Sequence, residues 1–205
     1  MRSSIRLLVL TGIAVYCSGC ASLGSNVPFQ YQPSLIASGK HIPKTVGFEM
    51  LADERPEKDR KYTERIKDVP GKITAKLIDD FSVSRLFSDV HYPPQETDNL
   101  LVSGVIKRFK WKYYDTLFAY IPYVGLGLTL LGLPISEAYG ITELQLTFKE
   151  RANGKILGTF SAESKITNPY SIYNFKAGES GSELAESFRD VTRKLKEEIA
   201  LKLEK

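Results

Sequence analysis

The sequence has few of the residues on which metal and redox sites depend. Two cysteines and two histidines occur in 205 residues, which is too few for a disulfide framework and argues against a Cys/His zinc site. The 28 Lys and Arg against 24 Asp and Glu give a net charge of +4, too small to indicate nucleic-acid binding. With 42% hydrophobic residues the chain is neither disordered nor collagen-like, and its length suits one domain.

Motifs for catalysis are also missing from the sequence. His41 and His91 have no partner at the spacing of a metal site, and there is no Gly-x-Ser-x-Gly elbow. Three glycines, Gly125, Gly127 and Gly132, lie in an apolar run without the dinucleotide-binding spacing. We therefore expect no enzymatic activity, no metal and no cofactor.

The first twenty residues have the layout of a secretory signal peptide. Two arginines precede an apolar run at 7–16 that is too short to span a membrane as a helix. The run ends in a Cys-Ser-Gly-Cys sequence at 17–20, which resembles the lipobox of bacterial lipoproteins, although Cys17 stands where leucine is usual. The resemblance implies a signal peptide at 1–19, cleavage before Cys20, and acylation of its thiol and new amino terminus.

Lipidation of Cys20 carries expectations about location. More than one acyl chain holds a protein stably on a membrane. Ala21 follows, rather than the aspartate that resembles an inner-membrane retention signal, so we expect the periplasmic face of the outer membrane. No free thiol would remain, which excludes cysteine chemistry. An ordinary signal peptide with incidental cysteines is the alternative.

The mature chain divides into a tether and a single domain. Residues 20–43 are rich in Ser, Gly, Pro and Gln and show no periodicity, which predicts a lipidated N-terminus and tether, followed by the domain at 44–205. Periodicity and turn signals predict strands at 44–51, 90–92, 100–114, 142–149 and 156–165, and helices over 73–87 and after a capping-box sequence at 180–183. The pair Asn153-Gly154 predicts a type I′ hairpin between the last two strands.

This element order predicts an α+β fold. We expect two layers, with a mostly antiparallel sheet and two helices on one face, in the order β-α-β-β-insert-β-β-α. Over residues 44–205 the order resembles the small α/β domain of the TolB amino-terminal region and of the curli-secretion channel lipoprotein. The resemblance implies a role beside periplasmic protein machinery.

An uncharged insert interrupts the domain at 116–136. Its 21 residues have the length of a membrane-spanning helix, but Pro122, Pro134 and three glycines would leave backbone groups unsatisfied in lipid. The insert is either a connection packed on the domain or an apolar excursion that contacts a membrane or neighbouring subunits through 117–134. Aromatic and cationic flanks favour the excursion. The predicted contact residues are Trp111, Tyr113, Phe118, Tyr120, Pro122, Tyr123, Leu126, Leu130 and Leu133, and the predicted interfacial cations are Arg108, Lys110 and Lys112.

The sequence therefore predicts an accessory or assembly subunit of an envelope complex. Its partners would be the membrane, through the N-terminal lipid, and another protein or further copies of the same chain. A carrier for a lipid or other apolar ligand is the alternative. We exclude nucleic acid, because the cations and aromatics alternating at 107–112 are explained by one solvated and one packed face of a strand.

Overall fold

The computed structural model describes residues 29, 31–33, 40–63, 66–121, 123–171 and 181–203. Predictions about the signal peptide, Cys20, Ser180 and Pro122 lie outside the described residues, as does the side chain of Phe118.

The described residues form an α+β fold, which confirms the predicted class. They comprise β1 (Ile42–Phe48), β2 (Ala52–Asp53), α2 (Glu57–Arg60), η1 (Lys61–Thr63), α3 (Val69–Ser84), β3 (Phe87–His91), β4 (Leu100–Asp115), η2 (Leu117–Tyr120), α4 (Val124–Leu130), β5 (Ser136–Glu150), β6 (Ile156–Tyr170) and α5 (Ser182–Leu203). Both helices that the sequence predicts are present, as α3 and α5.

One open sheet contains all the described strands. Its order is β3-β1-β4-β5-β6, with β2 beside β4. The short strands β1 and β2 pair parallel with β4, and β1 also pairs parallel with β3. The long β4–β5 and β5–β6 ladders are antiparallel, so most of the pairing is antiparallel as predicted. The parallel pairs were not predicted, because hydrophobic periodicity does not report which strands become neighbours.

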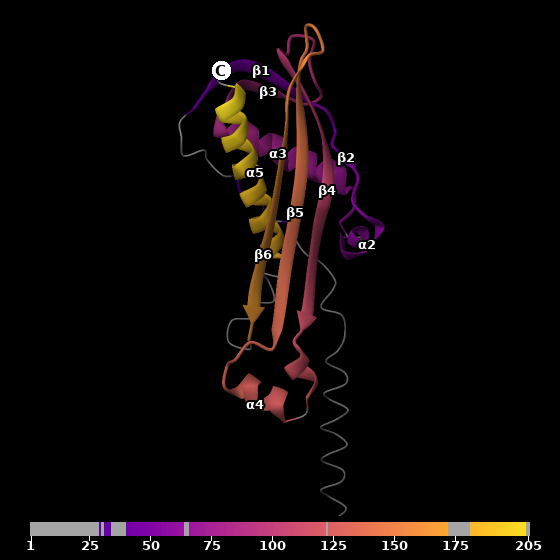
Figure 1. Ribbon diagram of the computed structural model, residues 1–205, viewed down its shortest axis with the longest axis vertical. Coiled ribbons are helices and arrows are strands. Elements are labelled where there is room, and N and C mark those ends of the chain that lie inside the picture. Colours follow the sequence, from indigo (N-terminus) through magenta and orange to yellow (C-terminus); the bar gives the residue numbers. More distant parts are fainter. Residues whose placement is uncertain are drawn as a thin grey trace, which may run out of the picture.

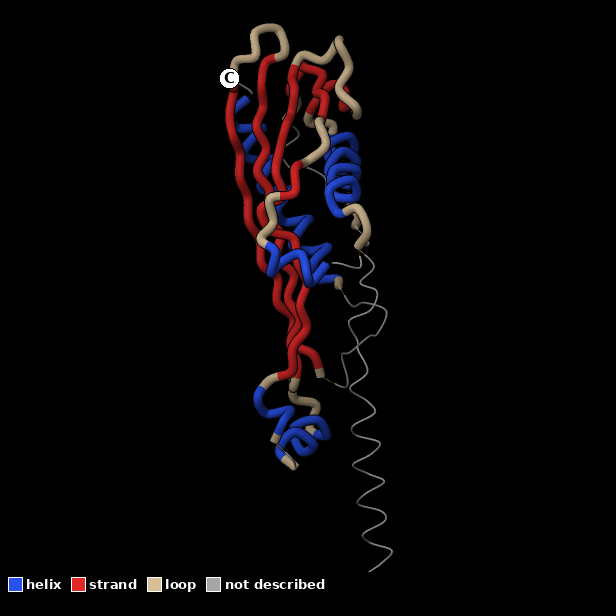
Figure 2. The backbone as a smooth tube through the Cα atoms, turned by 90° about the vertical axis from the view of Figure 1, so that its right-hand side faces the viewer, coloured by secondary structure: helices blue, strands red, loops and turns tan. Residues whose placement is uncertain are grey.

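The molecule is elongated along β4, β5 and β6. Figure 1 shows that these strands continue past the end of α5 toward α4, and Figure 2 shows the narrow projection from the side. We call residues 111–115, 136–140 and 166–170 the arm, and residues 116–135 at its end the tip. The remaining described elements, with α3 and α5, form the body. The sheet therefore holds the tip away from the body.

The core lies between the sheet and the two long helices. Leu77 and Phe81 of α3, Phe188 and Leu195 of α5, and Phe148 of β5 have no exposed surface. Helix α3 begins four residues before the predicted start because the Asp68 carboxylate caps it, accepting a hydrogen bond of 3.1 Å from the Gly71 amide. Proline is tolerated in the first helical turn.

Strand β4 contains an irregularity between Ile106 and Arg108. Val102 and Ile106 face the core before it, and Phe109 and Trp111 face the core after it. An extra residue in one strand of an antiparallel pair produces such a change of phase. The alternation predicted for the second half of this strand is confirmed.

The β5–β6 connection differs from the predicted type I′ turn. That turn needs positive φ at both central residues. Gly154 has a φ of 70°, whereas Asn153 is not among the residues of positive φ. Its side chain instead accepts a hydrogen bond of 2.8 Å from the Lys155 amide, and residues 151–154 form a longer loop. The hairpin is present with a different turn.

Candidate functional site

The uncharged insert forms the tip. It folds into η2 and α4, and α4 has seven residues. No helix in the described part of the chain is long and apolar enough to cross a membrane. Gly132, with a φ of 75°, follows α4 and ends it. The Thr116 amide donates to the Ile135 carbonyl at 2.8 Å, so the two ends of the tip meet where the strands end.

The large apolar side chains of the tip face solvent. Tyr123 is 87% exposed, and Leu117 and Leu131 are each 76% exposed. The other exposed large apolar residues of the tip are Tyr120, Ile121, Val124, Leu126, Leu130 and Leu133. In α4 only Gly125 is buried. The insert is therefore an excursion and not a connection packed on the body.

Carboxylates mark the junction between arm and tip. The Ser136 hydroxyl donates to Asp115 at 3.0 Å, and the Tyr114 hydroxyl donates to Glu137. This second hydrogen bond, with the nearby negative charge, raises the pKa of Tyr114. The first charged groups beside the tip are thus acidic, where the sequence predicted cations.

Two predicted contact residues belong to the interior instead. Trp111 is 7% exposed, and its indole N–H donates to the Glu183 carboxylate at 2.9 Å. Tyr113 is half-buried and lies beside Trp111 and Tyr170, with ring centroids 6.5 and 6.3 Å away. Both residues project from the strand face on which α5 packs, so they are corrected to packing residues.

The buried Glu183 fixes the first turn of α5 to the arm. It also accepts hydrogen bonds from Asn168 at 3.2 Å and from the Tyr170 hydroxyl. Carboxylates are favoured at helix N-termini, and three donors compensate its burial. Opposite it, a Cβ on Gly140 would lie 2.4 Å from the Glu183 backbone, so the contact requires glycine. Sequence reasoning placed Glu183 in a capping box but missed these partners.

The predicted interfacial cations lie on the opposite face of β4, away from the tip. Arg108 contacts Asp59 at 3.5 Å and Glu163 at 3.0 Å, and Lys110 contacts Asp59 at 2.8 Å. Lys112 lies over the Tyr62 ring, 5.7 Å from its centroid. These side chains attach η1 and α2 to the sheet. The prediction that they meet lipid headgroups is therefore corrected, because Arg108 and Lys110 pair with carboxylates of the protein and Lys112 lies on the Tyr62 ring.

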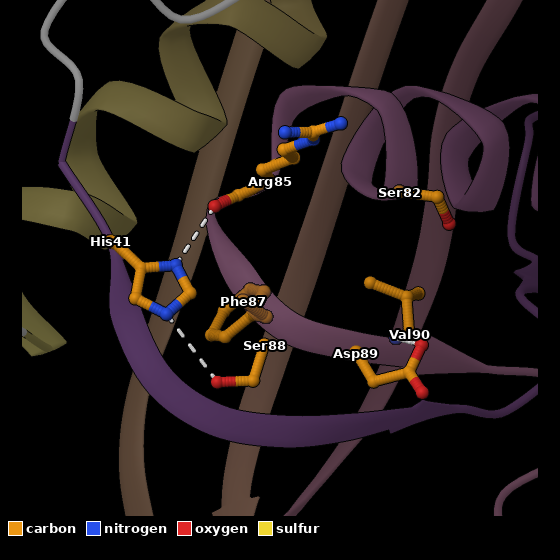
Figure 3. A pocket seen from close by; sticks show the side chains of 7 residues that line it. All are labelled: His41, Ser82, Arg85, Phe87, Ser88, Asp89 and Val90. Atoms are coloured by element: carbon orange, nitrogen blue, oxygen red, sulfur yellow. Dashed lines mark hydrogen bonds between the residues drawn. The ribbon is translucent and has the colours of Figure 1, made fainter.

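A cleft of about 350 Å³ lies in the body where β1, β3 and the end of α3 meet (Figure 3). The His41 Nδ1–H donates to the Arg85 carbonyl at 3.1 Å, and the His41 Nε2 contacts the Ser88 hydroxyl at 3.4 Å. The other lining residues are Ser82, Phe87, Asp89 and Val90. The lining is mixed, since five of its seven side chains are polar and two, Phe87 and Val90, are apolar. Across the described residues no group of three metal-binding side chains occurs.

Comparison with known proteins shows a shared fold without a shared sequence family. No family model matches the chain, and no curated protein matches it in sequence. A Xanthomonas campestris protein of the DUF330 family, XCC0632, is 9% identical and aligns over 84% of this chain and 93% of its own, with a TM-score of 0.54. This likeness shows the fold alone.

Weaker structural likenesses carry no conclusion. The PelC dodecamer of Paraburkholderia phytofirmans is 13% identical over 78% of this chain and 92% of its own, with a TM-score of 0.43. A minor lipoprotein of Acinetobacter baumannii is 9% identical over 80% of this chain and 92% of its own, with a TM-score of 0.33. The resemblance to the TolB domain and the curli lipoprotein stays a prediction.

Proposed function

We propose that the protein is a non-enzymatic lipoprotein on the periplasmic face of the outer membrane, where it is an accessory or assembly subunit of an envelope complex. It contacts the membrane or neighbouring subunits through residues 117–134. The exposed apolar tip, held at the end of a stiff three-stranded arm, is the observation that carries this proposal. The lipobox resemblance at 17–20 supplies the anchor.

The tip has the properties of a contact surface. Soluble monomers rarely expose a contiguous apolar patch of this kind unless it binds something. No charged side chain interrupts the sequence from Thr116 to Ser136. The arm separates the tip from the body, so the body of the same chain does not cover it (Figure 1).

The buried acidic residues support a non-enzymatic function, because each one has a structural role. Asp59 joins η1 and α2 to β4, and Glu183 joins α5 to the arm. Asp80 joins α3 to α5 through Lys196. Asp98 accepts a hydrogen bond of 2.6 Å from the Gln95 amide and lies 2.5 Å from His91 Nδ1, so it holds its loop to the end of β3. Catalytic carboxylates, in contrast, converge on a cleft that admits substrate.

The carrier alternative lacks a comparable observation. Holding a lipid or another apolar ligand requires an apolar cavity. The cleft of Figure 3 has His41, Arg85 and Asp89 in its lining, which suits polar molecules better. We therefore prefer surface contact to ligand carriage.

Expression in a Gram-negative host with fractionation and intact mass tests the proposal. The wild-type chain should begin at Cys20, carry the mass of its acyl chains and sediment with the outer membrane. Cys20→Ala should be released into the soluble periplasm, whereas Cys17→Ala, the matched control, should stay on the membrane. Native mass in detergent should then show an oligomer or a bound partner. A strictly monomeric particle with tightly bound lipid would favour the carrier instead.

A further inference from the structure

The chain is fixed to the body much earlier than the predicted tether of 20–43 implies. The Phe29 ring packs edge-on against Phe109 and Phe188, with centroids 5.2 and 5.4 Å away. Tyr31 is 7% exposed, and its hydroxyl donates to the Asp80 carboxylate at 2.5 Å. Phe29 is therefore the first described residue that contacts the body, nine positions after Cys20 in the sequence.

The reach of this segment is comparable to the length of the arm. Eight residues lie between Cys20 and Phe29, and the nine steps from one to the other span at most about 30 Å. Phe29 packs beside Phe109, and six residues of β4 lead from there to Asp115, a rise of about 20 Å. The tip lies beyond that point (Figure 2). The segment from Cys20 to Phe29 is therefore just long enough for a lipid on Cys20 to reach the level of the tip.

The chemistry of the tip suits the shallow part of a bilayer. Tyr120 and Tyr123 are exposed beside leucines, and tyrosine prefers the interface between lipid and water. The Asp115 and Glu137 carboxylates at the junction would resist deeper entry. Because no cation lies in the tip, apolar burial rather than attraction to anionic lipid would drive the contact.

We propose that the tip inserts into the same membrane leaflet that holds the Cys20 lipid, so that the protein stands on the membrane at two points. The inference rests on the proposed function for the anchor at Cys20. The short chain from Cys20 to Phe29 keeps the tip at high local concentration over that one leaflet. On this proposal the tip binds neither a second membrane nor a second copy of the chain.

Quenching of tryptophan by brominated lipid tests this arrangement. Mature chain produced without acylation can be coupled through its Cys20 thiol to a maleimide lipid in neutral phosphatidylcholine vesicles, which makes the test independent of natural lipidation. Tyr123→Trp reports from the tip. Ile156→Trp is the control, since Ile156 is exposed at the start of β6, at the end of the long strands away from the tip. Both variants keep the buried Trp111 as a common background.

The proposal predicts loss of emission for the tip variant alone. Emission of Tyr123→Trp should fall roughly twofold and shift to shorter wavelength when the brominated lipid is in the anchoring vesicle, and Ile156→Trp should not change. Brominated lipid in separate, anchor-free vesicles should have no effect. Quenching only by the anchor-free vesicles, or clustering of vesicles, would overturn the proposal, because the tip would then bind a second membrane. An unquenched tip in a chain that dimerises would overturn it as well, because the tip would then bind a second copy. Failure of natural acylation, read from intact mass, would refute the anchor alone.

Discussion

Lys196 of α5 and Asp80 of α3 form an ion pair of 2.7 Å in which neither side chain has exposed surface. The pair connects the two long helices beneath the sheet. Burial lowers the pKa of Lys196, and the Asp80 carboxylate opposes that shift. Asp80 also accepts the hydrogen bond from Tyr31. The interior that receives the N-terminal segment is therefore organised around one buried carboxylate.

Removing one partner of this pair should destabilise the fold strongly. Lys196→Met would leave the Asp80 charge buried without its cation, at a cost of about 3–5 kcal/mol in the free energy of unfolding. The double variant Lys196→Met/Asp80→Leu should lose less than the sum of the two single variants. Urea unfolding followed by circular dichroism measures each value. Lys202→Met, which removes an exposed pair with Glu198, should change it by about 0.5 kcal/mol or less. Simple additivity would contradict the coupling.

The docking of the N-terminal segment should contribute measurably to stability. Phe29→Ala removes a half-buried ring from contact with Phe109 and Phe188, and we expect a loss of about 2 kcal/mol. Gln32→Ala is the matched control, because Gln32 is exposed in the same segment. Proteolysis near residues 29–33 should also become faster in Phe29→Ala. Equal stabilities for the two variants would contradict the docking.

Stability should depend on pH through His91. Its Nδ1 lies 2.5 Å from the buried Asp98 carboxylate and its Nε2 lies 3.1 Å from Asp89. The hydrogen bond to Asp98 raises the pKa of His91, although desolvation opposes the shift. Because the unfolded value is about 6.5, the stabilisation is fully present below that pH and is lost as pH rises through the higher folded pKa.

Comparison with His91→Gln isolates this contribution. The difference in unfolding free energy between wild type and His91→Gln should shrink as pH rises from about 6 to about 9. Asp98→Asn should reduce this pH dependence, and the remainder should come from Asp89. An NMR titration of the imidazole reports the pKa directly. A difference that stays constant over this range would contradict the assignment.

Excision of the tip should leave a folded domain. Asp115 and Ser136 already face each other in the β4–β5 ladder, so an Asn-Gly turn can replace residues 116–135. The side chains removed are mostly exposed, and we expect cooperative unfolding with a free energy within about 1 kcal/mol of wild type. The same replacement of loop 151–154 is the control at the other end. Non-cooperative unfolding would show that the tip belongs to the core.

The sequence predicts the elements whose pattern is strong. Helix α5 was predictable because Leu184, Phe188, Val191 and Leu195 repeat at helical spacing and are all buried. The arm segments of β5 and β6 were missed. Residues such as Ser136, Ala138 and Gly140 face the interior there, and small residues give no apolar alternation. At Gly140 the small size is required by the close approach of α5, because a Cβ there would lie 2.4 Å from the Glu183 backbone, and periodicity does not report such a contact.

The candidate site was predictable in composition but not in geometry. Lack of charge in 116–136 is visible in the sequence, yet an uncharged run can be buried or exposed. The aromatic residues beside it looked alike, but Trp111 is buried whereas Tyr120 is exposed. The packing of Phe29 and Tyr31 on the body could not be predicted from the sequence either, because isolated aromatic residues in a polar segment show no hydrophobic periodicity. Tertiary contacts determine the exposure of the insert, the burial of Trp111 and the packing of Phe29 and Tyr31.

The change of phase in β4 divides this strand into a part that belongs to the body and a part that leads into the arm. Residues up to Ile106 pair with β5 in one phase, and residues from Arg108 through the arm pair with it in the other. Adding or removing residue pairs in the arm portions of β4, β5 and β6 would alter its height in steps of about 7 Å without turning any side chain to the other face. Insertions or deletions of this kind would therefore change the length of the arm independently of the core.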